Sequence, residues 1–132
     1  MHKVMALDIG TKRIGVALSD YLQVIATPHC VISRNPENTA IEEIYRIAKE
    51  NNVEKIVIGL PKNMDDSIGF QAQDCIDFSQ KISGFDIILE DERLTSEEAE
   101  ERLRQRKVDF RKNKGLVDME SASIILEQYL RR

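Results

Sequence analysis

The sequence predicts an α/β fold in which helices flank a mixed, five-stranded sheet. Near-continuous apolar runs, typical of buried strands, alternate along the chain with segments whose apolar residues recur at helical spacing. The first two runs are separated only by a short turn, as in an antiparallel pair. A chain of 132 residues has the size of one domain, so we expect a single domain over residues 1–132.

The first part of the chain predicts an antiparallel meander. Residues 3–8 form an apolar run that ends in Asp8, and a turn over residues 9–12 follows. In residues 13–19, larger apolar side chains alternate with small ones, which are Gly15, Ala17 and Ser19. The two runs therefore predict a β-hairpin with one crowded, small-residue face. Residues 26–33 supply the third predicted strand.

The remainder predicts helices that alternate with strands. Asn35 before Pro36 is typical of a helix start, with Asn35 as the N-cap. We expect strands over residues 55–60 and 86–89, and helices over residues 95–107 and 116–130. A further helix is predicted between Ser67 as its cap and Gly84 at its end. The resulting order, β-β-β-α-β-α-β-α-α, is that of the ribonuclease H-like fold.

Composition narrows the class of protein. Hydrophobic residues make up 42% of the chain and charged residues 32%, as is ordinary for a globular protein. No apolar run approaches the roughly 20 residues that span a bilayer, and Asp8 interrupts any signal-peptide core. We therefore expect a cytoplasmic protein without a membrane partner. Cys30 and Cys75 have no zinc-binding spacing and are expected to be reduced thiols.

Three acidic positions interrupt otherwise apolar patterns. Asp8 ends a buried strand, and Asp118 shares a helix face with Ala122 and Ile125. Acids also follow the strand over residues 86–89, where alternation directs Asp91 and Glu92 to opposite sides. Each acid also has a purely structural explanation. Asp8 could form an Asx-turn, Asp118 could complement the helix dipole as an acid of the first turn, and Asp91 and Glu92 could be solvated charges at a strand end.

Carboxylates from these places could converge on a divalent cation. Mg²⁺ and Mn²⁺ prefer oxygen ligands, and such ions can clamp the attacking and leaving oxygens of a phosphodiester. The two histidines, His2 and His29, do not form a competing zinc site. The pattern thus favours a metal-dependent nuclease, and a net charge of −4 argues only against a non-specific nucleic-acid coat.

Four segments resemble the YqgF family, also called RuvX, whose members are pre-16S rRNA nucleases similar to Holliday-junction resolvases. The segments are ALDIGTKRIGVALSD (residues 6–20), IVIGLPKNMDDS (56–67), DERLTS (91–96) and KGLVDMESASIILEQYL (114–130). With the spacing between them, they cover essentially the whole chain. The resemblance implies a ribonuclease H-like fold and a role in trimming the 5′ end of the 16S ribosomal RNA precursor.

The resemblance also implies roles for single residues. Asp8, Glu92 and Asp118 would be both the catalytic acids and the metal ligands, with Asp91 as the alternative to Glu92. The expected substrate contacts within the matching motifs are Arg13, Lys62, Asn63 and Arg93. One departure is visible: Asp66 stands where the family loop commonly has glycine, which adopts a positive φ more easily.

A basic segment over residues 102–114 contains seven Lys and Arg side chains against one acid, Asp109. Because it leads into the helix that carries Asp118, we expect Arg111, Lys112 and Lys114 to hold a phosphate backbone at the site. The alternative is a solvated, salt-bridged helix face, since four glutamates lie just upstream. Phe110 is the only aromatic residue in the segment, so base stacking there is expected to be minor.

Three hypotheses on function remain open from the sequence. The first is a nuclease that acts on structured RNA, the 16S rRNA precursor. The second is a Holliday-junction resolvase that acts on branched DNA, which would require a dimer with two active sites; the sequence permits a monomer or a homodimer. The third is a non-catalytic nucleic-acid-binding module that has kept the fold.

Overall fold

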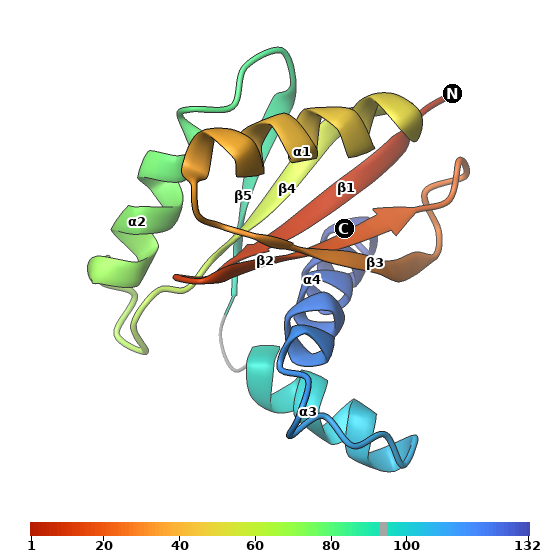
Figure 1. Ribbon diagram of the computed structural model, residues 1–132, viewed down its shortest axis with the longest axis vertical. Helices are drawn as coiled ribbons and strands as arrows, with labels where there is room; N and C mark the ends of the chain where they lie inside the picture. Colours follow the sequence, from red (N-terminus) through yellow and green to blue (C-terminus); the bar gives the residue numbers. More distant parts are fainter. Residues whose placement is uncertain (93–94) are drawn as a thin grey trace.

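The computed structural model describes residues 1–92 and 95–132 and contains the predicted order of elements (Figure 1). The strands are β1 (Lys3–Ile9), β2 (Arg13–Ser19), β3 (Ala26–Ser33), β4 (Val53–Leu60) and β5 (Asp86–Asp91). The helices are α1 (Glu37–Glu50), α2 (Phe70–Ser79), α3 (Thr95–Gln105) and α4 (Gly115–Leu130).

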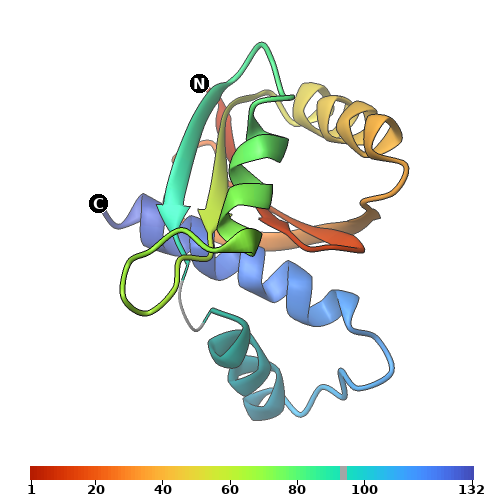
Figure 2. The same ribbon diagram turned by 90° about the vertical axis from the view of Figure 1, so that its left-hand side faces the viewer.

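The strands form one mixed, five-stranded sheet in the order β3-β2-β1-β4-β5, which confirms the predicted sheet. β1, β2 and β3 pair antiparallel, whereas β4 and β5 run parallel to β1. Helices α1 and α2 cover one face of the sheet and α4 covers the other (Figures 1 and 2). Helix α3 packs on α4.

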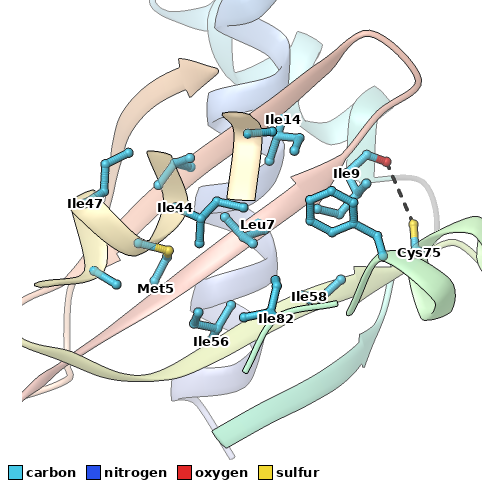
Figure 3. Packing of buried hydrophobic residues seen from close by; sticks show 14 of the residues in the cluster. Met5, Leu7, Ile9, Ile14, Ile44, Ile47, Ile56, Ile58, Cys75 and Ile82 are labelled. Atoms are coloured by element: carbon cyan, nitrogen blue, oxygen red, sulfur yellow. Dashed lines mark hydrogen bonds between the residues drawn. The ribbon is translucent and has the colours of Figure 1, made fainter. Parts of the chain in front are cut away.

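Alternation along β1 divides the apolar core into two layers. Met5, Leu7 and Ile9 point toward α1 and α2, where they join the larger core cluster (Figure 3). The intervening Val4 and Ala6 belong to the smaller cluster beneath α4. A strand covered on both faces has to be apolar on both. Asp8 continues the Val4–Ala6 series, so its carboxyl points toward the α4 side of the sheet.

Small residues on β2 allow α4 to lie directly on the sheet. A Cβ at Gly15 would stand 2.0 Å from the carbonyl oxygen of Asp118 and 3.0 Å from the Met119 nitrogen. Ala17, two residues further on the same face, packs in the α4 cluster with Ala122. The predicted small-residue face of this strand is therefore the seat of the last helix.

Three predicted helix boundaries were wrong. The N-cap of helix α1 is Pro36 rather than Asn35, and Pro36 makes no side-chain capping hydrogen bond. Helix α2 begins after Gly69 and ends at Ser79, whereas the sequence predicted Ser67 as its cap and Gly84 as its end. Ser67 instead hydrogen-bonds within the preceding loop, and Gly84, with φ of +86°, forms the turn before β5.

Both cysteines are free thiols, as expected. Cys75 lies in the core, with its thiol 3.8 Å from the Ile9 carbonyl oxygen (Figure 3). Within the described part of the chain, no helix combines the length and apolar character needed to cross a bilayer.

Replacing Gly15 with Ala is expected to lower the free energy of unfolding by about 3 kcal/mol, because the methyl group would meet rigid backbone of α4. Equilibrium urea denaturation measures the change. Gly69→Ala is the matched control, since a Cβ there meets only the side chain of Asn63, at 3.1 Å or more. Equal losses in the two variants would contradict this account of the α4 contact.

Candidate active site

The candidate site lies where the carboxyl ends of β1, β4 and β5 meet at one edge of the sheet. This edge is where open α/β sheets usually bind ligands. Asp8 comes near the end of β1, Glu92 directly follows β5, and Asp118 lies in the first turn of α4. All three carboxyl residues line one pocket of about 200 Å³, which we call the acid pocket. Its other lining residues are Ile9, Gly10, Thr11, Pro61, Gln71, Asp74 and Ser96.

Strand parity explains why Glu92, rather than Asp91, reaches the acid pocket. Ile88 on β5 packs with the α4 cluster, whereas Ile87 packs with the core on the opposite face. Residues 90 and 92 continue the series of Ile88, so Glu92 points to the same side of the sheet as Asp8. The Glu92 amide donates to the Leu60 carbonyl at 3.0 Å, which extends the pairing of β5 with β4 up to this residue. Asp91 is exposed and does not line the pocket.

Gly59 on β4 provides the space that the Glu92 carboxyl occupies. A Cβ at this position would stand 2.4 Å from Glu92 Oε2 and 2.6 Å from the Cδ1 of Ile125 on α4. Glycine is therefore needed here for the space it leaves rather than for its backbone freedom. This role was not predicted from the sequence, although a glycine inside an apolar strand can mark a place where another group approaches the backbone closely.

Asp8 and Glu92 are hydrogen-bonded to each other. Burial is the main cause that raises the pKa of Glu92, and the charges of Asp8 and Asp118 raise it further. Burial also raises the pKa of Asp8, whereas its hydrogen bond with Glu92 lowers it. The pKa of Glu92 is therefore raised further than that of Asp8. Within residues 1–92 and 95–132, no cationic side chain forms an ion pair with either acid.

Asp118 is held by a cation from the β-hairpin. The Nε of Arg13, the first residue of β2, donates to Asp118 Oδ2 at 2.7 Å, and both side chains remain partly exposed. As the side chains stand, the described residues include no group of three Asp, Glu, His or Cys residues arranged to hold a metal ion. The three carboxylates thus line one pocket, but their side chains are not oriented toward a single position that a metal ion could occupy.

A buried arginine that was not predicted from the sequence forms hydrogen bonds to the turn after Asp8. Arg34 bonds to both carboxylate oxygens of Asp74, at 2.5 and 2.8 Å, and donates to the Gly10 carbonyl at 3.1 Å. Its backbone amide donates to the Lys12 carbonyl at 2.9 Å. Because Arg34 neutralises Asp74, that acid stands beside the pocket as a paired charge. No periodicity or motif identified this pair from the sequence.

The acid pocket is the middle of a longer groove. On one side it shares Ser96 and Asp118 with a depression of about 490 Å³, which is also lined by Arg13, Glu100, Phe110, Arg111, Lys114 and Val117. On the other side it shares Pro61, Gln71, Glu92 and Ser96 with a depression of about 310 Å³ that reaches Lys62, Asn63, Met64, Thr95 and Glu97. Acids therefore occupy the centre of the groove, and cationic side chains stand toward both ends.

The structure divides the basic segment into two parts. On α3, Arg102 pairs with Glu127 at 2.8 Å and Arg104 pairs with Glu101 at 3.2 Å, and Arg106, directly after the helix, bonds to Glu120. These three arginines fit the salt-bridged alternative. Beyond α3, Lys112 and Lys114 are exposed and have no acidic partner within the described residues, and Arg111 is 85% exposed although it pairs with the adjacent Asp109.

The expected substrate contacts are distributed unevenly. Arg13, Lys62, Asn63, Arg111 and Lys114 line the groove, whereas Lys112 does not. The side-chain amide of Asn63 is engaged within its own loop, where it donates to the Ser67 hydroxyl at 2.9 Å. Arg93 lies outside the described residues. Ser96, which lines all three parts of the groove, was not identified from the sequence.

The departure at residue 66 has a visible consequence. Asp66 adopts a φ of +69°, the left-handed region that glycine would enter without steric cost. Aspartate tolerates this conformation better than most residues, so the loop over residues 61–69 keeps its turn.

Known proteins match this chain over almost its whole length. The model of the RuvX family, described as a Holliday junction resolvase, matches residues 2–132. A protein of Crocosphaera subtropica is 44% identical over 129 residues, which cover 96% of this chain and 90% of the relative. One of Halothermothrix orenii is 43% identical over 131 residues, 97% of this chain and 94% of the relative. Both relatives bear the name "Putative pre-16S rRNA nuclease".

Solved structures share the fold at low sequence identity. A fowlpox virus resolvase bound to Holliday-junction DNA superposes with a TM-score of 0.58 at 14% identity, over 98% of this chain and 97% of that chain. RuvC of T. thermophilus bound to a Holliday-junction substrate superposes with a TM-score of 0.54 at 10% identity, over 99% and 96%. The chain has the ribonuclease H-like fold, and the predictions of fold and family are confirmed.

Replacing Glu92 with Gln is expected to stabilise the protein at neutral pH without divalent cations. Because the folded-state pKa of Glu92 is raised, the folded protein binds this proton more tightly than the unfolded chain does. The free energy of unfolding therefore falls as pH rises from the ordinary carboxyl range toward the raised value. The Gln variant lacks this loss, so we expect an advantage of about 1 kcal/mol or more by about pH 8.

Thermal unfolding in EDTA across this pH range measures the effect, with Glu42→Gln as an exposed control on α1. The advantage of the Glu92 variant should shrink as pH falls to about 4, where the carboxyl is protonated in both states. A Gln variant that is less stable than the natural protein at every pH would show that Glu92 is not a strained buried acid.

Proposed function

The chain belongs to the RuvX family, and on that premise we propose that it is a metal-dependent nuclease that hydrolyses phosphodiester bonds in the precursor of 16S ribosomal RNA. The observation that carries the proposal is the convergence of Asp8, Glu92 and Asp118, from three separate elements, on one pocket in the middle of a groove. The names of the relatives support RNA as the substrate. This function implies a cytoplasmic location.

The chemistry of the pocket fits a hard divalent cation, Mg²⁺ or Mn²⁺. The neighbouring carboxyls of Asp8 and Glu92 are partly buried, their pKa values are raised, and they have no cationic partner among the described residues; a bound cation would stabilise their charged forms. We propose Asp8, Glu92 and Asp118 as the catalytic residues and metal ligands. When bound, the ion supplies a nucleophilic water at neutral pH and neutralises charge on the phosphodiester.

The protein side chains would bind and orient the substrate. Arg13 and Lys114, with Arg111, would hold backbone phosphates on one side of the acid pocket, and Lys62 would hold them on the other side. Asp118 would join the other two acids once Arg13 exchanges its carboxylate for a substrate phosphate. Glu92 would release its proton when the ion binds, because ligating carboxylates are deprotonated.

A Holliday-junction resolvase is the second candidate function. It is favoured by the description of the matching family and by two solved resolvases of the same fold, both bound to junction DNA. Cutting a symmetric junction requires two active sites and hence a dimer. A monomer would suffice for trimming RNA, so the oligomeric state in solution helps to separate the two candidates.

We expect the purified protein with Mg²⁺ or Mn²⁺ to cleave a fragment of the 16S precursor and to leave a four-way DNA junction intact. Asp8→Asn should lower the cleavage rate about 1,000-fold or more, since metal-based stabilisation is worth several kcal/mol. Asp86→Asn, at the opposite end of β5, is the matched control and should retain full activity.

Cleavage of the junction instead of the RNA would establish the resolvase function. Undiminished RNA processing by Asp8→Asn, both in vitro and in cells, would exclude the acid pocket as the catalytic centre. No cleavage of either substrate by the natural protein, together with normal RNA processing in cells that carry Asp8→Asn, would leave a non-catalytic nucleic-acid-binding module.

Replacing Gly59 with Ala is expected to lower kcat about 10- to 100-fold, because the new methyl group displaces the Glu92 carboxyl. The free energy of unfolding should change by only about 1–3 kcal/mol, since the atoms in contact are the ends of flexible side chains. Gly84→Ala is the matched control: it strains a residue with φ of +86° far from the pocket and should affect stability but not kcat. Full activity of Gly59→Ala would refute the positioning role.

A further inference from the structure

We propose that Phe70, together with Met64 and Ile68, forms a platform on which an unpaired base of the substrate stacks beside the groove. We call the three side chains the stacking platform. This inference rests on the proposed function in one respect: it assumes that the groove holds a nucleic-acid strand. It narrows the substrate to RNA with at least one unstacked nucleotide next to the cleaved bond, as opposed to an uninterrupted duplex.

The three side chains are exposed to an extent that the fold does not require. Phe70, the first residue of α2, is 85% exposed, Met64 is 69% exposed and Ile68 is 45% exposed. The buried face of α2 is made by other residues, Ala72, Cys75, Phe78 and Ser79. Burial of a phenylalanine side chain stabilises a folded protein, and the exposed ring of Phe70 does not contribute this stabilisation. A gathering of exposed apolar side chains next to a polar groove is typical of a binding surface.

Hydrogen bonds within the loop place this surface beside the groove. The Asn63 amide donates to the Ser67 carbonyl at 3.0 Å, and its side chain donates to the Ser67 hydroxyl at 2.9 Å. The Asn63 side chain also lies against Gly69, where a Cβ would stand 3.1 Å from it. The loop is thus closed on itself, which brings Ile68 and Phe70 back to the start of the loop.

The platform adjoins residues that line the groove. Met64 itself lines the depression that contains Lys62, and Gln71, the residue after Phe70, lines the acid pocket with Glu92. Figure 2 shows the loop over residues 61–69 at the same end of the molecule as the start of α3, below the ends of β4 and β5. A strand that leaves the acid pocket past Lys62 therefore meets the platform next.

The charges around the platform favour a base over a phosphate. Asp65 and Asp66 lie in the middle of the loop, and their carboxylates do not attract a phosphate backbone. The neutral, flat face of a base matches the apolar surface, while Lys62 remains available for the adjacent phosphate. Proteins that bind single strands commonly combine a cationic track with an exposed aromatic ring in this way. In a duplex the base faces are already stacked, so only an unpaired nucleotide can reach Phe70.

The test compares two RNA ligands in the Asp8→Asn background, which prevents cleavage. One is a hairpin with a single-stranded flank that carries 2-aminopurine, and the other is a blunt duplex of equal charge. Stacking is worth about 1–3 kcal/mol per base, so Phe70→Ala should weaken binding of the flanked hairpin about 5- to 100-fold. It should also abolish the quenching of 2-aminopurine fluorescence, while duplex binding stays unchanged. Phe70→Tyr should behave like the parent protein.

Leu22→Ala is the matched control, because Leu22 is 72% exposed on the hairpin between β2 and β3. Equal weakening of both ligands by Phe70→Ala, or no change in either, would overturn the platform. Loss of self-association in place of RNA binding would show that a second copy of the chain covers this surface. If the natural protein cleaves RNA and Phe70→Ala leaves binding of both ligands unchanged, only this inference is refuted. Absence of RNA binding, together with absence of cleavage by the natural protein, would refute the proposed function.

Discussion

The direct seating of α4 on the small-residue face of the sheet is the contact on which the rest of the site depends. At Gly15 the helix backbone lies so close that no side chain fits between the two elements. Because of this close approach, Asp118 lies beside Asp8, whose carboxyl points to the side of the sheet that α4 covers. On the neighbouring strand, Gly59 leaves the space into which Glu92 extends. Two glycines therefore set the separation of the three acids, and larger residues would hold them apart.

Much of this arrangement could be predicted because it depends on patterns within short segments of the sequence. The order of strands and helices follows from apolar runs and periodicity, and the small-residue face predicted on β2 is the face on which α4 lies. Asp8 and Asp118 were conspicuous because each places a charge on an otherwise apolar face. The helix boundaries at Asn35 and Ser67 were wrong because a cap depends on the path of the preceding chain, which local sequence does not contain.

What local patterns could not supply depends on the relation between distant segments. Alternation separates Asp91 from Glu92, but only the packing of Ile88 beneath α4 decides which of them faces the pocket. The pairing of Arg34 with Asp74 joins residues 40 positions apart, and neither lies in a motif. Likewise, the position of α3 against α4 divides the basic segment. Arginines next to α4, such as Arg102, pair with glutamates, whereas Lys112 and Lys114 lie beyond the contact and remain exposed.

The order in which the acids occur along the chain has a consequence for biosynthesis. Asp8 is made first, Glu92 follows more than two-thirds of the way through, and Asp118 comes only with the final helix. Until that helix emerges from the ribosome and docks, the nascent chain has two of the three acids and an open apolar face. On the proposed function, a chain on which α4 has not yet docked lacks one of its three metal ligands, so its active site is incomplete.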